Sequence, residues 1–226
     1  MTGRFIVLEG VDASGKSTQA RRLVDWLVGR GIDAIYTRHP GSTAIGAELR
    51  GLTAGRELDA NTKALLFAAD NSAFITQILR PRLEVGTWIV SDRNNFVSSL
   101  AYQVADGCPL EQLDRVHDAT AFRPPKIDLL LILCAKPETI AARRCERALA
   151  VKDVYEERMA TQKYFDKVAS TYQAMAQGET FGRLPKFVYS RPVAIDADGD
   201  VETVSMAIKS AVKSHLLLSA DCLGIL

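Results

Sequence analysis

Short apolar runs alternate with longer segments of helical spacing along the whole chain. The runs have the length and the aliphatic content of buried parallel strands. They are Phe5–Leu8, Ala34–Tyr36, Trp88–Val90, Leu129–Leu133 and, as the last, either Phe187–Tyr189 or Val193–Ile195. Between them, apolar residues recur at intervals of three and four residues, which is typical of amphipathic helices. The predicted helices cover Thr18–Arg30, Ile45–Leu52, Thr62–Glu84, Ser98–Val104, Leu110–Ala121, Pro137–Ala150, Tyr155–Gln177 and Val201–Leu217.

This alternation predicts an α/β fold, a three-layer sandwich in which a five-stranded parallel sheet carries helices on both faces. Gly31 is expected to close the first helix, and Pro81 to interrupt the long helix that begins at Thr62. No repeat and no linker divides the 226 residues, so we expect one domain over 1–226. A chain of this length buries a sizeable core without disulfides or metals.

Composition and charge narrow the range of partners. Apolar residues make up 47% and charged residues 24% of the chain, and the formal net charge is +1. Because basic residues are not in excess, we expect no nucleic-acid partner. Because no apolar run reaches about 18 residues, we expect no membrane span. The four cysteines show no C-x-x-C spacing and no signal peptide precedes them, so we expect free thiols in the cytoplasm.

The first strand is followed by a phosphate-binding motif. Residues 10–17 read Gly10-Val11-Asp12-Ala13-Ser14-Gly15-Lys16-Ser17, which is the G-x-x-x-x-G-K-S of a P-loop. Its glycines allow backbone N–H groups to surround phosphate oxygens, Lys16 adds a positive charge, and the Ser17 hydroxyl can ligate Mg²⁺. A glycine-rich turn that matches by chance is the alternative, but the strand before and the helix after the motif favour a P-loop NTPase.

Charged residues also follow the later strands, where the ligands of parallel sheets bind. Asp92, just beyond Trp88–Val90, has the position of a carboxylate that holds Mg²⁺, with a helix N-cap as the alternative. Arg93 suits a phosphate clamp, and its alternative is an ion pair with a nearby carboxylate. Three further arginines at 143, 144 and 147 suit a lid over a phosphoryl group, or else a solvated helix face. Arginines together with a metal ion are what phosphoryl transfer requires.

Taken in order, these pieces resemble the thymidylate kinase family of nucleoside monophosphate kinases, over roughly residues 4–212. The matching segments are Leu8-Glu9-Gly10-Val11-Asp12-Ala13-Ser14-Gly15-Lys16-Ser17-Thr18-Gln19, Thr37-Arg38-His39-Pro40-Gly41-Ser42-Thr43, Leu65-Leu66-Phe67-Ala68-Ala69-Asp70, Asp92-Arg93, Ser98-Ser99-Leu100-Ala101-Tyr102-Gln103, Asp153-Val154-Tyr155-Glu156 and Asp196-Ala197. A P-loop alone occurs in many proteins, whereas the ordered set is much more specific.

The resemblance implies ATP-dependent phosphorylation of dTMP to dTDP, with Mg²⁺ as cofactor, by a homodimer with a short lid at about 143–156. It implies ATP binding by Gly10, Ala13, Ser14, Gly15, Lys16, Ser17, Thr18 and Arg144, metal binding by Ser17 and Asp92, and catalysis by Lys16, Arg93 and Arg147. The implied acceptor site comprises Asp12, Arg38, Pro40, Phe67, Asn71, Arg93, Ser99, Tyr102 and Gln103. In it Asp12 accepts a hydrogen bond from the 3′-hydroxyl, the two arginines hold the 5′-phosphate, and Phe67 stacks on the base.

Several of these residues have structural alternatives, and the chain departs from the family on the acceptor side. Phe67 and Tyr102 also suit a core, and Ser99 suits a helix cap. Asn71 stands where the family usually has an arginine, and the segment after Asp92 is one residue longer than usual. A kinase for another or a modified pyrimidine nucleotide, such as dUMP or dCMP, therefore remains an alternative. A P-loop regulatory ATPase without a phosphorylated product is a second one.

Overall fold

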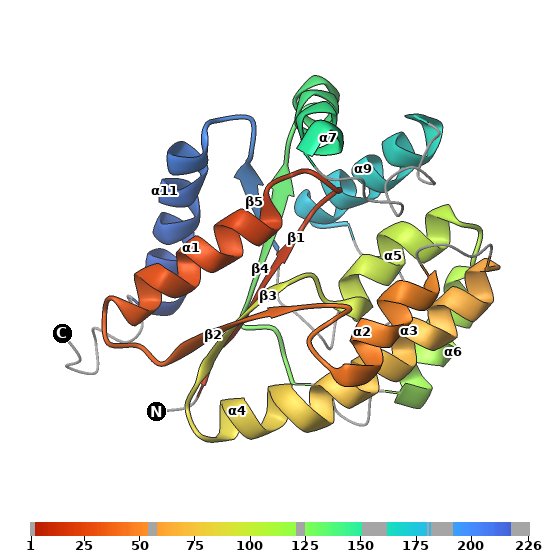
Figure 1. The fold of residues 1–226 in the computed structure, drawn as a ribbon, viewed down its shortest axis with the longest axis horizontal. Helices are drawn as coiled ribbons and strands as arrows, with labels where there is room; N and C mark the ends of the chain where they lie inside the picture. Colours follow the sequence, from red (N-terminus) through yellow and green to blue (C-terminus); the bar gives the residue numbers. More distant parts are fainter. Residues whose placement is uncertain are drawn as a thin grey trace.

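The computed structural model describes residues 3–53, 58–120, 125–150, 162–179, 181 and 192–217. Its centre is a parallel sheet in the order β2-β3-β1-β4-β5 (Figure 1). The strands are β1 Phe5–Glu9, β2 Ala34–Arg38, β3 Trp88–Asp92, β4 Leu129–Cys134 and β5 Val193–Asp196. The five-stranded parallel sheet is thus confirmed, and Val193–Ile195 lies in its fifth strand. The other candidate, Phe187–Tyr189, lies outside the described residues.

The helices follow the predicted segments, with shifted ends. They are α1 Lys16–Val28, α2 Ala44–Thr53, α3 Ala60–Phe74, α4 Arg80–Glu84, α5 Asn95–Ala105, α6 Leu110–Thr120, α7 Pro137–Ala150, α9 Gln162–Ala176 and α11 Val201–Val212. Two π-helical segments, Ile75–Leu79 and Lys213–Leu217, join α3 to α4 and extend α11. The N-terminal part of the helix predicted over Tyr155–Gln177 lies outside the described residues. None of the described helices has both the length and the apolarity needed to cross a bilayer.

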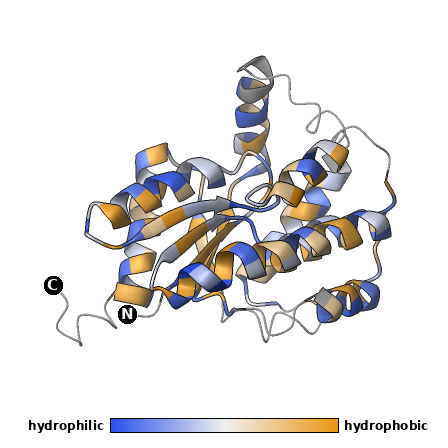
Figure 2. Cartoon of the chain, turned by 60° about the horizontal axis from the view of Figure 1, so that its bottom comes forward, coloured by the Kyte–Doolittle hydropathy of each residue, from blue (hydrophilic) through white to orange (hydrophobic). Residues whose placement is uncertain are grey.

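Alternate side chains of β1 face opposite layers of the sandwich. Ile6 and Leu8 pack in one cluster with residues of α1 and α11, such as Leu23. Phe5 and Val7 pack in another cluster with residues of α3, α5 and α9. Figure 1 shows these two sets of helices on opposite sides of the sheet, and Figure 2 shows the predominantly hydrophobic strands between them. The three-layer arrangement therefore follows from a strand that is apolar at every position except its last.

The two predicted helix signals act in different ways. The amides of Gly31 and Ile32 donate to the carbonyls of Val28 and Leu27, and Gly31 has a φ of 77°, so it closes α1 as expected. The expectation that Pro81 interrupts this helix is wrong. The helical segments run on from α3 to α4, and only the hydrogen-bond pattern changes before the proline. The amide before it, of Arg80, donates to a carbonyl five residues back, and Pro81 occupies the first turn of α4, where no N–H is needed.

Candidate active site

The P-loop connects β1 to α1 and curls around a buried lysine. Gly10 has a φ of 141°, and a Cβ there would lie 2.6 Å from the carbonyl oxygen of Leu133, so only glycine fits. The Lys16 ammonium donates to the Val11 carbonyl at 2.7 Å and lies 3.4 Å from the Ser14 hydroxyl. Burial and the charge of Arg93 lower the pKa of Lys16 to about 8, although nearby carboxylates oppose the shift. The loop therefore carries a cation that a phosphate would stabilise.

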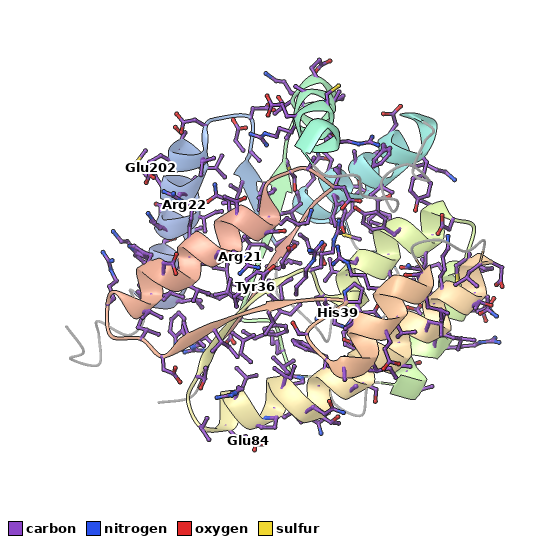
Figure 3. The ribbon with its side chains drawn as sticks, in the orientation of Figure 1. Arg21, Arg22, Tyr36, His39, Glu84 and Glu202 are labelled. Atoms are coloured by element: carbon purple, nitrogen blue, oxygen red, sulfur yellow. The ribbon has the colours of Figure 1, made fainter. Side chains whose placement is uncertain are left out.

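Asp92 ends β3 beside the first turn of α1. The Ser17 hydroxyl donates to Asp92 Oδ2, and the Tyr36 hydroxyl lies 3.4 Å from the same oxygen. Tyr36 itself is covered by the Arg21 guanidinium, 4.1 Å from the ring centre (Figure 3). The N-cap of α5 is Asn94, whose side chain accepts from the Phe96 amide, so the alternative role of Asp92 as a cap is wrong. Its carboxylate is instead directed at the P-loop serine.

The oxygens of Ser17 and Asp92 are suited to a hard cation such as Mg²⁺. Within the described ranges, no three His, Cys, Asp or Glu side chains gather so that they could hold a metal on their own. A magnesium ion at this pair would therefore draw its other ligands from water and from a bound nucleotide, which is the usual arrangement at phosphate sites.

Arg93 lies directly after Asp92 and spans the space between β3 and the P-loop. Its Nη2 donates to Asp12 Oδ1 at 2.5 Å and to the Tyr102 hydroxyl at 2.8 Å, and that hydroxyl donates to Asp12 Oδ2 at 3.1 Å. Burial raises the pKa of Asp12, but the charges of Arg93 and Lys16 outweigh burial and lower it to about 2. The ion pair that was the alternative role of Arg93 thus exists, and it lies beside the P-loop, where a phosphate clamp was expected.

Two residues of this cluster were not predicted from the sequence. Glu9, the last residue of β1, is fully buried and accepts from the Ser98 hydroxyl and the Tyr172 hydroxyl. Tyr172 of α9 in turn accepts from Arg93 Nη1 at 3.3 Å. A charged residue at the end of an apolar strand was a usable signal for Glu9. Tyr172 falls on the apolar face of its helix, so the sequence pattern indicates a core residue and gives no sign of its hydrogen bonds.

The loop after β2 is braced against α3. His39 Nε2 lies 3.2 Å from Asp70 Oδ2, and the Thr43 hydroxyl donates to the other oxygen of Asp70 at 2.5 Å. Burial lowers the pKa of His39 to about 4 despite the neighbouring carboxylate, so the imidazole is neutral near pH 7. The peptide bond to Pro40 is cis. Arg38, the residue before His39, has its Nε 3.9 Å from Asp92 Oδ2.

The predicted base-binding residues lie on the packed helices α3 and α5. Phe67 is 8% exposed, yet it belongs to none of the hydrophobic clusters defined by the described residues. Asn71, one turn later, is fully buried, and neither its amide nitrogen nor its amide oxygen has a hydrogen-bond partner among the described residues. Ser99 and Gln103 are buried on α5, and the Ser99 hydroxyl pairs with His117 Nε2 at 2.9 Å. Ser99 is therefore within α5 and not its cap.

The arginines of α7 lie in different places. Arg143 Nη2 donates to the Gly199 carbonyl at 3.1 Å in the loop after β5. The guanidinium of Arg144 lies 3.8 Å above the ring of Phe165, at a cavity of about 490 Å³ that also touches Val11. Arg144 is therefore near the P-loop, although α9 already occupies one of its faces. The side chain of Arg147 and residues 151–156 of the predicted lid lie outside the described part of the chain.

A P-loop after the central strand, with an Asp-Arg pair after the neighbouring one, defines the fold and site of a P-loop nucleotide kinase. The model of the thymidylate kinase family matches residues 8–184, and the chain belongs to that family. The resemblance noted in the sequence is thereby confirmed.

Relatives named as thymidylate kinases align along nearly the full chain. One from Prochlorococcus marinus (strain MIT 9313) is 34% identical over 95% of this chain and 96% of its own. A probable thymidylate kinase from Thermococcus kodakarensis is 34% identical over 94% and 98%. A thymidylate kinase from Symbiobacterium thermophilum is 36% identical over 94% of both chains.

Proposed function

We propose that the protein transfers the γ-phosphoryl group of ATP to dTMP and releases ADP and dTDP. Family membership supports this activity. The observation that carries it is the Asp12–Arg93–Tyr102 cluster. It puts a carboxylate suited to a sugar hydroxyl and an arginine suited to a phosphate directly beside the P-loop. A regulatory ATPase has no need for a second set of arginine and carboxylate groups beside its P-loop.

The transfer is a displacement at the γ-phosphorus. An oxygen of the acceptor phosphate bonds to the γ-phosphorus, the bond to the bridging oxygen breaks, and its electron pair leaves on ADP. Lys16 holds the donor phosphates, while Arg38 and Arg93 hold the acceptor phosphate and prevent the repulsion of the two anions. Because the acceptor phosphate is already ionised, no general base is required.

Magnesium would be bound by Ser17 and Asp92 together with the ATP phosphates. There it would neutralise charge on the β- and γ-phosphates. The Ser17–Asp92 hydrogen bond supports this role, because it already brings the two ligand oxygens together.

The base of the acceptor is proposed to lie between Phe67 and Asn71 of α3 and the polar face of α5. A buried amide without a partner is costly, and its unused donor and acceptor match the edge of a pyrimidine. Asn71 can serve the O4 and N3–H groups of thymine. With its amide turned over, it can equally serve the amino group and N3 of cytosine. This ambiguity is the reason to keep another pyrimidine monophosphate as a second candidate.

We also propose a cytoplasmic homodimer. Support for the cytoplasm comes from Cys108, Cys134 and Cys145, which are free thiols in the described part of the chain. Support for a dimer comes from α3, on which Leu65 remains 52% exposed. Sedimentation at several concentrations tests the dimer, because a species of 24.7 kDa throughout would contradict it.

A coupled assay of ADP release tests the function. It uses ATP and Mg²⁺ with dTMP, dUMP, dCMP or dGMP in turn, and Lys16→Met as the inactive control. A strong preference for dTMP supports the proposal, and a preference for another pyrimidine nucleotide moves the assignment to the second candidate. ADP release that no nucleotide stimulates would refute both kinases and favour a regulatory ATPase.

A further inference from the structure

Arg93 is held on its far side by two residues that form no hydrogen bond with Lys16 or Ser17 in the described part of the chain. Its Nη1 donates to the Tyr172 hydroxyl at 3.3 Å, and that hydroxyl donates to Glu9 Oε2 at 2.7 Å. Glu9 is 0% and Tyr172 is 2% exposed, so water does not substitute for either partner. A continuous chain of hydrogen bonds therefore runs from the end of β1 through α9 to the guanidinium.

The backbone of Arg93 also needs support. Its φ of 77° is in the left-handed region, which is unfavourable for a residue other than glycine. Glu9 Oε1 accepts from the Asn94 amide at 2.8 Å and from the Ser98 hydroxyl at 2.8 Å. One carboxylate thus fixes the segment that follows Arg93 with one oxygen and orients Tyr172 with the other.

The charges in this cluster explain why the hydroxyl is needed. Glu9 Oε2 lies 3.8 Å from Arg93 Nη1, too far for a hydrogen bond, so Tyr172 fills the gap between them. On the opposite side, Nη2 is already engaged by Asp12 and Tyr102. Without the Tyr172 hydroxyl, the described residues would leave the guanidinium hydrogen-bonded at Nη2 but not at Nη1, so its plane would be less firmly held.

We propose that Tyr172 and Glu9 are positioning residues for Arg93. The Tyr172 hydroxyl, oriented by Glu9, holds the plane of the guanidinium so that its remaining N–H groups face the acceptor phosphate. This inference rests on the proposed function, because it assigns the positioned arginine to the acceptor phosphate. It adds to that function a group on α9 that acts through Arg93 and not on the substrate.

Tyr172→Phe is the first test, since it removes one oxygen and keeps the buried ring. Because the variant loses a hydrogen bond to a charged group, its kcat/KM for dTMP should fall by about 10- to 100-fold. The KM for ATP stays within about twofold, because Tyr172 donates nothing to the P-loop. Tyr164→Phe is the matched control on the same helix, as its hydroxyl donates to the backbone carbonyl of Tyr102 at 3.4 Å. Equal activities of the two variants would overturn the proposal.

A double-mutant cycle separates positioning from a general structural effect. In an Arg93→Lys background, Tyr172→Phe should change kcat/KM by less than about twofold, because the group through which it acts is gone. The same 10- to 100-fold loss in that background would show that Tyr172 acts independently of Arg93. Glu9→Gln gives a second route should Tyr172→Phe fail to fold. It should lower kcat/KM for dTMP, and most of this effect should vanish in the Arg93→Lys background.

A measurement without turnover keeps this inference distinct from the proposed function. In ¹⁵N NMR spectra, a guanidinium held at both Nη atoms rotates slowly and gives separate Nη signals, which Arg93→Lys identifies by their loss. Tyr172→Phe should merge these signals, and unchanged signals would refute the positioning role. If the wild type does not phosphorylate dTMP while Tyr172→Phe still merges the signals, the proposed acceptor is refuted and the positioning role stands.

Discussion

Replacing Asp12 by asparagine is expected to lower stability in a pH-dependent way. The carboxylate accepts from Arg93 and from Tyr102, and its side chain is only 26% exposed against 13% for that of Arg93. Asparagine keeps the shape and removes the charge. The arginine then loses its closest counterion while it remains largely buried, which is the costly way to break an ion pair.

The pKa of Asp12 gives the magnitude. Its value of about 2 in the folded protein lies below the ordinary 3.8, so the charged form stabilises the fold at higher pH. That contribution is complete well above pH 3.8 and is lost as the pH falls through about 2. It amounts to about 2 kcal/mol of the free energy of unfolding at pH 7 and to about half of that at pH 3.

Urea unfolding of the wild type and of Asp12→Asn at pH 7, 4 and 3 measures this difference. The gap between the two proteins should be similar at pH 7 and pH 4 and about half as large at pH 3. Glu111→Gln is the control, because its pair with Arg115 is 78% and 73% exposed and should contribute little at any pH. A gap that stays constant down to pH 3, or one no larger than the control's, would refute the reasoning.

Three further outcomes are expected. Gly46→Ala should lower the free energy of unfolding by about 1–3 kcal/mol in thermal denaturation, since its Cβ would lie 2.8 Å from the Gly41 nitrogen. Gly51→Ala on the same helix is the control, because its Cβ would meet no atom within 4 Å and should not destabilise the protein. Because the pKa of Lys16 is about 8 without ligand, ATP binding should take up a proton at pH 9 but not at pH 6.5, and calorimetry in buffers of different ionisation enthalpy detects the uptake. Equal proton counts at both pH values would contradict the shift. Asp92→Asn should raise the Mg²⁺ concentration for half-maximal activity at least about tenfold, and an unchanged Mg²⁺ dependence would argue against its role as a ligand.

The parts of the site that the sequence predicted are those encoded over short distances. The P-loop needs eight consecutive positions, and Asp92 and Arg93 need only the strand before them. The parallel sheet brings such positions to the same edge without any further information. For this reason the pairing of Ser17 with Asp92 was predictable in its chemistry, although not in its geometry.

What the sequence did not reveal depends on contacts between distant segments. Tyr172 meets Glu9 across 163 positions, and nothing in its amphipathic helix distinguishes it from a core residue. The start of α5 shows the same limit. The sequence predicted that this helix begins at Ser98, but the Ser98 hydroxyl is bound to Glu9. The helix begins three residues earlier, at Asn95, and Asn94 is its cap. In each case a tertiary hydrogen bond decided between local alternatives of similar propensity.

The position of β1 in the sheet has a consequence for synthesis of the chain. Its two neighbours are β3 and β4, which begin at Trp88 and Leu129, so both edges of the strand stay unpaired until those segments have left the ribosome. During that interval Phe5–Leu8 is an exposed apolar segment with free backbone groups, which favours association with other chains. The nucleotide-binding loop, encoded first, is therefore among the last parts to acquire its final surroundings. Truncations that end before β4 are expected to be insoluble, even though they contain the complete P-loop.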